Sequence, residues 1–461
     1  MRTKRWFLCG VIATLIAAAV TAAHAAETVK PLSLSESIDL ALKRSVLIHA
    51  AREGVRGAEA QRKEAFTGFL PKFSTSFGYT RLNEDPTVTS PGGSFTFPGP
   101  PPIPVTIPPS TYQAGTKDNY NWSLEARQPL FAGGGILANY EASRIGTEIV
   151  RLEETATVQD LVQDVKIAYF NILKAGRIHA VARQSVERLT AHRDTAQGFY
   201  DVGIIPRNDL LYTEVELANG RQFLVRAENS LEMAKSKFNT LLRREINAPV
   251  EIEDTPNDRP FAKPLDGCIA AALENRPEIR SYALRLEQAK SLVKLARSEY
   301  YPNVGLVGNY ARYGDTPGVA GSPYRDQESW YVMAVANWNF WEWGKTKNRV
   351  DAGLSRENQA ADILTNIREQ IALEVKNAWL LLHEAEKQIH VAKKTTEQAE
   401  ENFRINTERY REQVGTSTDV IDAQTLLTKA RSDHDNALGD YSISRAKLER
   451  AMGAAAPGGV K

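Results

Sequence analysis

The amino-acid sequence contains an internal duplication. In the first half, residues 35–42 are followed by Phe69-Leu70-Pro71, and in the second half residues 266–273 are followed at the same spacing by Tyr300-Tyr301-Pro302. A period this long is typical of a duplicated half-domain and not of a solenoid of short repeats. Each half therefore predicts the same order of elements: a helix, two strands, a very long helix, a sharp turn and a returning helix.

The duplication also sets the expected domain boundaries. We predict a first structural repeat over residues 26–255, a second over residues 256–453 and a flexible tail over residues 454–461. Matched residues in the two turns are Tyr200 with Tyr410 and Asp209 with Asp419.

Two proline-free stretches are too long for helices of an ordinary globular domain. No proline occurs in residues 136–200 or 345–413, and helices of this length would reach roughly 95–100 Å. Apolar and small residues recur in both with alternating steps of three and four, which is the heptad seam of packed helices. The seam residues are Val158, Leu161, Val165, Ala168, Ile172, Ala175, His179, Ala182, Val186 and Leu189, and Ile371, Val375, Ala378, Leu382, Ala385, Ile389, Ala392, Thr396, Ala399 and Phe403. The returning helices carry the same spacing, so we expect two long helical hairpins.

The N-terminus reads as an export signal. Arg2, Lys4 and Arg5 precede an apolar stretch, and Ala23-His24-Ala25 forms a small-residue cleavage site, so residues 1–25 are predicted to be a signal peptide. The apolar run is short for an uncleaved membrane anchor. Cys9 lies too early, and lacks the small residues before it, for a lipoprotein site. Cleavage would change the formal net charge from +1 to about −2.

The composition of the mature chain excludes several classes of protein. Only Cys268 remains, so no intramolecular disulfide can form, and a buried, small apolar role is expected for it on its helix. The near-neutral charge gives no reason to expect nucleic-acid binding.

Four stretches alternate apolar and polar residues with the period of a β-strand. Their apolar residues are Phe73, Phe77 and Tyr79; Tyr120, Trp122, Leu124 and Ala126; Val304, Leu306 and Tyr310; and Trp330, Val332, Ala334, Ala336, Trp338 and Phe340. Aromatic residues near strand ends are typical of outer-membrane barrels. A soluble sheet packed on one face would alternate in the same way, but the export signal and the lack of another core for these aromatics favour the membrane. Since the smallest such barrels need about eight strands, several copies are expected to share one.

The connections within the strand pairs differ in length. The first, from about Arg81 to Lys117, is rich in proline and glycine, whereas the second, from about Arg312 to Gln327, is short. We expect the long connection to be a surface loop without regular structure.

Together, the export signal, the duplication, the strand pairs and the long helices resemble the TolC-type family of outer-membrane efflux factors over nearly the whole mature chain. The motifs that carry the resemblance are Leu70-Pro71, Tyr301-Pro302, Gln128-Pro129-Leu130-Phe131-Ala132-Gly133-Gly134, Gly203-Ile204-Ile205-Pro206-Arg207-Asn208-Asp209-Leu210 and Val414-Gly415-Thr416-Ser417-Thr418-Asp419-Val420-Ile421-Asp422-Ala423. Within the duplication, Asn339-Phe340-Trp341-Glu342-Trp343-Gly344 corresponds to Pro129-Leu130-Phe131-Ala132-Gly133-Gly134. The resemblance implies a mainly α fold with membrane β structure. In it, duplicated long-helix hairpins form a trimeric α-barrel in the periplasm, and four strands per chain form a shared 12-stranded barrel in the outer membrane.

The same resemblance implies the function and the partners. The homotrimer would be the passive exit duct of a tripartite efflux or type I secretion system, surrounded by outer-membrane lipid. It would meet a periplasmic adaptor protein and an inner-membrane transporter through the tips of the helical hairpins. No cofactor, metal or nucleic acid is implied. The alternative is a periplasmic coiled-coil adaptor or structural protein without a pore, but an adaptor needs one helical hairpin and this chain predicts two.

The expected site residues lie at the hairpin tips. Aspartates near the tips of the second helix pair form a cation-selective ring in the family, and the matching positions are Asp419 and Asp422, which share one helix face. The tip turns, expected to dock the partners, contain Gly203, Pro206 and Asp209 in the first copy and Gly415, Thr416 and Ser417 in the second.

Two features of the tips leave alternatives open. Asp419, like Asp209, could serve as a helix N-cap, which we favour over the ring for Asp419, whereas Asp422 lies inside the helix, where the ring is favoured. The second turn also has two fewer residues between its glycine and its aspartate than the first. Ser417 stands where some relatives carry a basic residue that latches the tip closed.

Catalytic patterns do not fit. His383-Glu384 lacks a second histidine at the spacing of a zinc-protease helix, and the solvated face of a rod explains His383 and His390. Gly133-Gly134-Gly135 lacks the lysine of a phosphate-binding loop and is explained by a bend from strand to helix. We therefore predict no enzyme and no catalytic residue.

Overall fold

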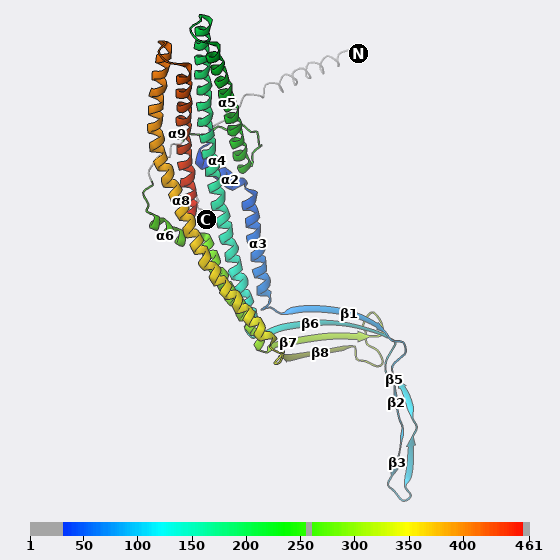
Figure 1. Cartoon of the computed structure of the whole chain (residues 1–461). Coiled ribbons are helices and arrows are strands. Elements are labelled where there is room, and N and C mark those ends of the chain that lie inside the picture. The colour runs from blue at the N-terminus through cyan, green and yellow to red at the C-terminus, as the bar shows by residue number, and fades with distance from the viewer. Residues whose placement is uncertain (1–30, 255–260, 455–461) are drawn as a thin grey trace, which may run out of the picture. The chain divides into compact units, whose positions relative to one another are not determined.

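The computed structural model describes residues 31–254 and 261–454, and in it each half follows the predicted order of elements (Figure 1). The first half comprises α2 (Leu34–Arg44), α3 (Val46–Thr67), β1 (Lys72–Arg81), β6 (Asp118–Ala132), α4 (Gly135–Asp201) and α5 (Arg207–Leu241). The second comprises α6 (Leu265–Asn275), α7 (Pro277–Arg297), a 3-10 turn (Ser298–Tyr300), β7 (Asn303–Gly314), β8 (Glu328–Asn337), α8 (Lys345–Arg411) and α9 (Ser417–Ala451). The predicted signal peptide and all but the first residue of the predicted tail lie outside the described residues.

The first helix of each half is broken in two, where the sequence predicted one. In the second half the break falls at Arg276, which precedes Pro277 and has extended dihedral angles (φ −70°, ψ 124°). A proline disfavours the helical conformation of the residue before it, which ends α6 there. In the first half Ser45 adopts the same extended conformation (φ −66°, ψ 122°) without a proline.

Contacts divide the chain into two compact units. Of the described residues, the helical unit contains those up to Arg52, those within Glu153–Ile279 and those from Ile367 onward. The sheet unit contains Glu53–Leu152 and Arg280–Asn366. Among the described residues, no helix has the length and apolar character that crossing a membrane requires.

The heptad seams are the buried faces of α4 and α8. Every seam residue predicted in these two helices is buried or half-buried, while the exposed positions between them carry mostly charged and polar residues, with a few exposed apolar residues on α8 such as Leu373 and Val391. Beside the seam of α4, Tyr169 is fully buried with Phe238 at the end of α5, and its hydroxyl donates a hydrogen bond to the carbonyl oxygen of Glu253 at 2.7 Å. Cys268 is fully buried, as predicted, and burial raises the pKa of its thiol.

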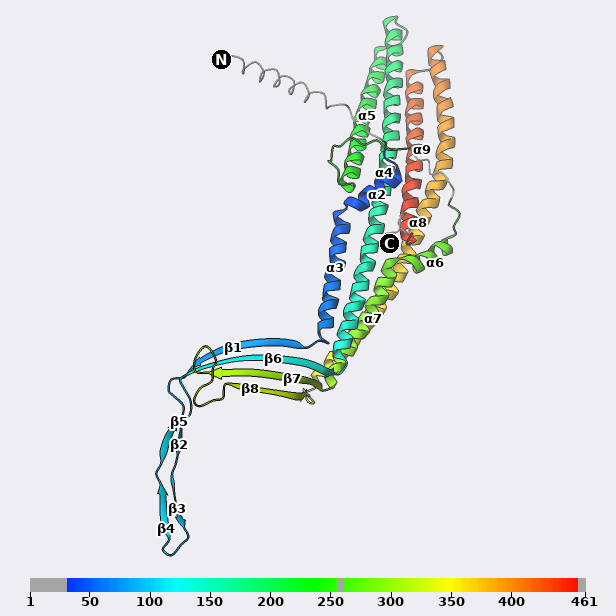
Figure 2. The same ribbon diagram turned by 180° about the vertical axis from the view of Figure 1, so that it is seen from behind.

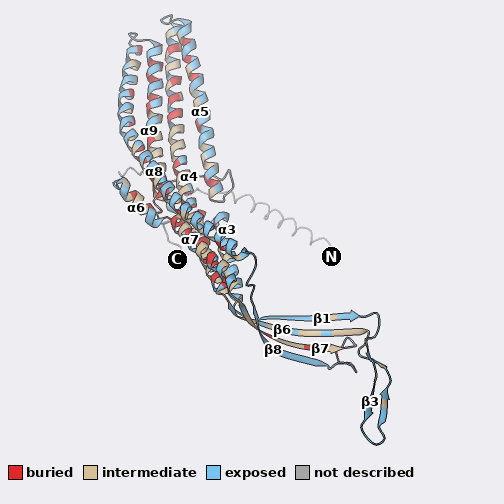
Figure 3. Ribbon diagram, turned by 60° about the horizontal axis from the view of Figure 1, so that its bottom comes forward, coloured by how far each residue is buried: buried red, intermediate tan, exposed pale blue. Residues whose placement is uncertain are grey.

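The sheet unit contains one four-stranded antiparallel sheet in the order β1-β6-β7-β8. The register brings the predicted apolar sets onto one face, because Phe77 lies opposite Trp122 and Leu124 lies opposite Tyr310, which lies opposite Trp330. No residue of β1 or β8 is buried (Figure 3). The four strands and their alternation are therefore confirmed, except that Trp338 and Phe340 lie beyond the end of β8 at Asn337.

The long connection between β1 and β6 is not the irregular loop that the sequence predicted. It forms β2 (Thr87–Ser90), β3 (Gly93–Phe97), β4 (Ile103–Ile107) and β5 (Ser110–Gln113), paired as β2–β5 and β3–β4. The two pairs follow one another as a single two-stranded ribbon (Figure 2). Short runs of β-branched and aromatic residues outweigh the prolines here. Pro104 is tolerated because, in a two-stranded ribbon, each strand has an open edge that needs no donor.

The bend from strand to helix at Gly133 explains its glycines. Gly133 (φ 58°) and Gly134 (φ 82°) both adopt the left-handed conformation. A Cβ atom on Gly133 would also lie 2.3 Å from the carbonyl oxygen of Ser298, so no other residue fits without a shift of the backbone.

Candidate functional site at the hairpin turns

The turns at the ends of the two helical hairpins have the same backbone structure. The first spans residues 202–206 between α4 and α5, and the second spans residues 412–416 between α8 and α9. In the first, the amide of Ile204 donates to Phe199 at 2.8 Å, and in the second the amide of Val414 donates to Arg409 at 2.9 Å. With the shorter-range bonds beside them, both are Schellman motifs that close a helix C-terminus.

The turns are equal in length, although the second has two fewer residues between its glycine and its aspartate than the first. Gly203 (φ 78°) has its structural counterpart in Gln413 (φ 59°), not in Gly415. The glycine of the second copy, Gly415, therefore lies two residues later in a turn of the same length. Consequently Pro206 and Thr416 occupy the same N-cap position, and Asp209 and Asp419 lie in the same first helical turn.

Exchanging the residues at this left-handed position should have opposite effects in the two turns. Gly203→Ala should destabilise the first turn by about 1 kcal/mol, because a Cβ is strained at positive φ. Gln413→Gly should stabilise the second by about 0.5 kcal/mol, because relief of strain exceeds the entropy cost of glycine. Native-state hydrogen exchange of the Ile204 and Val414 amides measures both local openings. Effects of the same sign in the two variants would contradict this assignment.

Asp419 belongs to a capping box, and the N-cap itself is Thr416. The Thr416 hydroxyl accepts from the Asp419 amide at 3.2 Å, and the Asp419 carboxylate accepts from the Thr416 amide at 3.0 Å. The prediction that Asp419 is the N-cap is therefore wrong by three residues, since the helix begins at Ser417. Hydrogen bonds from Thr416 lower the pKa of Asp419. In the first copy Pro206 offers no side-chain cap to α5, and Asp209 is half-buried.

Asp419 and Asp422 are both exposed on α9, while Val420, Ile421 and Ala423 between and beside them are buried. The two carboxylates therefore share the solvent-facing side of the helix, as their spacing predicted.

Ser417 is not an exposed turn residue, because it is 2% exposed and bonds to the other hairpin. Nε2 of His192 on α4 lies 2.9 Å from its hydroxyl oxygen, and the hydroxyl of Thr213 on α5 lies 3.2 Å from it. The ring of Tyr410 lies 4.9 Å from the ring of His192 and 5.4 Å from that of Phe199. Burial lowers the pKa of His192 to about 4, so the imidazole is neutral.

Sequence reasoning missed His192. It lies three residues after Leu189 and four before Ala196, both buried on the seam side of α4. That spacing could have placed it in the interface, but its partner is separated from it by 225 positions.

The contact between the hairpins continues along α4 and α9. Polar pairs alternate with small residues, and Gly439 on α9 lies against the side chain of Lys174 on α4. The pairs are Ser185 with Thr428 at 3.1 Å, Lys174 with Asp440 at 2.8 Å, Lys166 with Glu449 at 2.6 Å and Asp160 with Arg450 at 2.7 Å.

This interface ends in a buried charge cluster. Arg276 and Arg450 each have side chains 7% exposed, and both donate to Glu278 at the start of α7, at 2.9 and 2.6 Å. Glu374 on α8 pairs with Arg276 at 2.7 Å. Burial alone would raise the pKa of Glu278, but the hydrogen bonds from the two arginines outweigh it and bring the pKa to about 2.

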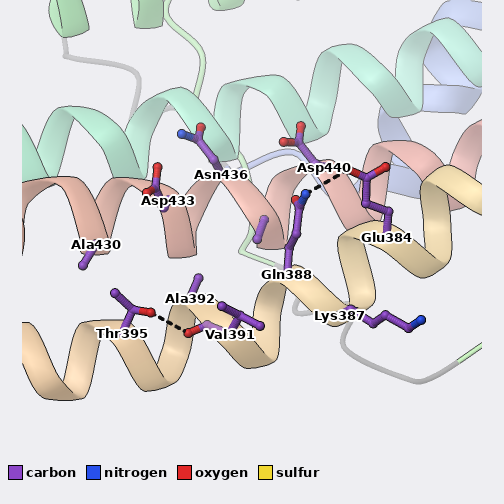
Figure 4. A pocket seen from close by; sticks show the side chains of 11 residues that line it. Glu384, Lys387, Gln388, Val391, Ala392, Thr395, Ala430, Asp433, Asn436 and Asp440 are labelled. Atoms are coloured by element: carbon purple, nitrogen blue, oxygen red, sulfur yellow. Dashed lines mark hydrogen bonds between the residues drawn. The ribbon is translucent and has the colours of Figure 1, made fainter.

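An open groove of about 520 Å³ lies between α8 and α9 (Figure 4). Its carboxylates include Asp433, and its exposed apolar residue Val391 is 66% exposed. Within it, Gln388 donates to Glu384 at 3.1 Å. The groove is not an enclosed chamber of the kind that buries a small-molecule substrate.

The other histidines and acidic residues do not gather into a metal site. In the part of the chain that the structure describes, no group of three or more His, Cys, Asp or Glu residues is placed to hold a metal ion. His390 is exposed, as predicted, whereas His383 is half-buried, because its ring packs against Trp379 at 4.0 Å and lies 3.1 Å from Glu386.

Comparison with known proteins gives consistent matches. A family model described as outer membrane efflux protein matches residues 37–242 and 268–454. Protein CyaE of Bordetella pertussis is 27% identical over 199 residues, which is 43% of this chain and 41% of that protein. Outer membrane protein TolC of Escherichia coli is 19% identical over 305 residues, 64% of this chain and 62% of its own. The crystal structure of the Campylobacter jejuni CmeC outer membrane channel aligns with a TM-score of 0.77 at 19% identity, over 91% of this chain and 85% of that one. The chain thus matches less than two thirds of the length of either curated relative.

Proposed function

The chain belongs to the outer membrane efflux protein family, and on this premise we propose that it is the outer-membrane exit duct of a tripartite efflux or type I secretion system. The duct is passive and carries out no reaction, and an inner-membrane transporter drives substrates through it. Three copies form the duct.

The observation that carries the proposal is the four-stranded sheet. The apolar set predicted from the sequence lies on one face of it and is exposed or half-buried, with Phe73 at 71%, Trp330 at 72% and Val332 at 69% exposed. Its edge strands β1 and β8 each pair with a strand on one side only, β6 and β7 respectively, and their outer edges have no strand partner among the described residues. Four strands are too few to close on themselves, and unpaired strand edges are not tolerated in lipid. Edge strands of neighbouring copies therefore pair, and three copies make a 12-stranded barrel in the outer membrane.

The helical hairpins supply the second part of the duct. At 67 residues each, α4 and α8 are roughly 100 Å long, which suits a tunnel through the periplasm. The turns that contain Gly203, Pro206, Asp209, Gly415 and Thr416 are the surfaces that meet the periplasmic adaptor and the inner-membrane transporter. Ser417 does not dock partners and instead holds the two hairpins together through His192.

Asp419 and Asp422 form the acidic ring. Both are exposed on one side of α9, and three copies bring six carboxylates to the mouth of the tunnel. A ring of carboxylates favours cations over anions.

Single-channel conductance of the detergent-extracted protein in a planar bilayer tests both the duct and the ring. We expect small, cation-selective openings that multivalent cations block from the side of the helical turns. Asp422→Asn should reduce the cation preference severalfold, without the loss of capping that a change at Asp419 causes. Asp209→Asn, at the equivalent of Asp419 in the first copy, should leave selectivity unchanged.

The outcomes separate the two parts of the proposal. A folded oligomer that never conducts, even with both Asp419 and Asp422 replaced, would refute the duct. Conductance with selectivity unaffected by Asp422→Asn would refute the ring alone.

A further inference from the structure

The two-stranded ribbon formed by β2, β3, β4 and β5 has no charged side chains. No charged residue occurs between Asp85 and Lys117, although exposed ribbons ordinarily carry charges that keep their edges from pairing with other chains. The ribbon therefore lacks the usual protection against association.

The register of β3 and β4 sorts their side chains by polarity. Phe97 lies opposite Ile103 and Phe95 opposite Val105, so these four side chains share one face. Ile107, opposite Gly93, extends it. The reverse face carries the polar pair of Ser94 with Thr106 and the pair of Thr96 with Pro104.

The apolar face is open to solvent in the single chain. Phe95, Phe97, Ile103 and Ile107 are 46%, 56%, 62% and 49% exposed. The rings of Phe95 and Phe97 lie 5.1 Å apart, so they form a continuous aromatic surface. An isolated two-stranded hairpin is at best marginally stable in water, so a face of this kind needs a cover.

We propose that the cover is the same face of the ribbons of the neighbouring copies, so that three ribbons pack together around a shared apolar core. This inference rests on the proposed function, in which β1 and β8 of adjacent copies pair. The ribbon continues directly from β1 and β6, and β1 is one of the two edge strands that form that contact. Tethering at equivalent positions of a closed ring raises the effective concentration of the ribbons into the millimolar range or above, about what short linkers achieve.

Charge favours a second copy over a lipid surface as the occupant. Polybasic segments draw a protein to anionic headgroups, but the ribbon has no lysine or arginine, and the residues at its base, Glu84, Asp85, Lys117 and Asp118, are mainly acidic. The face is uncharged and identical in every copy, so copies meet without electrostatic repulsion.

Cysteine cross-linking tests the inference with a matched pair of neighbouring positions. Phe95→Cys places a thiol on the apolar face and Thr96→Cys places one on the reverse face, and both positions are exposed. Cys268 is fully buried and does not compete. In the detergent-extracted protein under mild oxidant, we expect Phe95→Cys to form disulfide-linked pairs at least about tenfold faster than Thr96→Cys, because effective concentration applies only to facing thiols.

Each outcome decides between named alternatives. Equal cross-linking at both positions overturns the ribbon core while leaving the duct intact. Absence of cross-linking at both positions, in a protein whose mass is that of a trimer, does the same. In the second case, a polarity-sensitive fluorophore on Phe95→Cys that is quenched by vesicles with brominated acyl chains would identify lipid as the occupant. A monomeric mass would overturn the duct and the ribbon core together.

Discussion

Replacing Glu278 with glutamine should lower the free energy of unfolding of the helical unit by about 2–4 kcal/mol, since removing one partner of a buried ion pair leaves the other charge uncompensated. Two arginines depend on this carboxylate, and both are almost fully buried. This loss of stability is at the lower end of the range measured for broken buried ion pairs, because the Glu278 side chain is 24% exposed and solvent partly screens its charge. Thermal unfolding followed by helical circular dichroism measures the effect.

Glu374 provides the control for this prediction. It pairs with the same Arg276 at 2.7 Å, but its side chain is 51% exposed, so Glu374→Gln should cost less than about 1 kcal/mol. The pH dependence has a defined sign. Because the pKa of Glu278 is lowered from its ordinary value of 4.5 to about 2, its stabilising contribution is present above the ordinary value and is lost as pH falls through about 2. Equal losses from the two variants would contradict the central role of Glu278.

Acidification should release the contact between the hairpins at Ser417. The pKa of His192 is about 4 in the folded protein against an ordinary 6.5. As pH falls, the histidine is therefore protonated at a higher pH when the contact is open than when it is closed. The contact should therefore be at full strength above about pH 6.5 and weaken by about 3 kcal/mol as pH falls to about 4. Hydrogen exchange of the amides in the first turns of α9, measured across that range, reports the opening.

His192→Gln separates titration from packing. Glutamine can still bond the Ser417 hydroxyl but does not titrate, so these amides should show the same free energy of opening at pH 4.5 and pH 7 in the variant, once the intrinsic pH dependence of amide exchange is removed. A wild-type protein in which the free energy of opening at the α9 amides does not change with pH below 6.5 would rule out the histidine as the cause.

Much of the fold could be predicted from the sequence because it depends on local periodicity. The seam residues Val165, Ala182 and Val375 are buried where the three-four spacing placed them. The alternation of Phe77, Trp122 and Trp330 placed them on one face of a sheet before any strand pairing was known. Membership of the family followed from the order of these elements.

The site was less predictable because its contacts join distant parts of the chain. The bond between His192 and Ser417 has no sequence signature. Matching Gly203 with Gly415 also gave the wrong alignment of the two turns, because the structural counterpart of Gly203 is Gln413. The spacing from Tyr200 to Asp209, equal to that from Tyr410 to Asp419, carried the correct register. In the ribbon, prolines concealed an alternation at Phe95 and Phe97 that becomes visible only when the pairing partner is known.

The two open edges of the sheet have a consequence for how assembly stops. Because β1 and β8 are different strands, a contact between them joins unlike surfaces of two copies, and such head-to-tail contacts grow without limit unless rotation closes the ring. The strand pairing alone does not fix the number of subunits at three. In the proposed assembly, the curvature that each four-stranded sheet contributes would then help to set the number of subunits. A substitution that flattens the sheet, far from either edge, would change the stoichiometry of the particle while leaving every hydrogen bond between subunits intact.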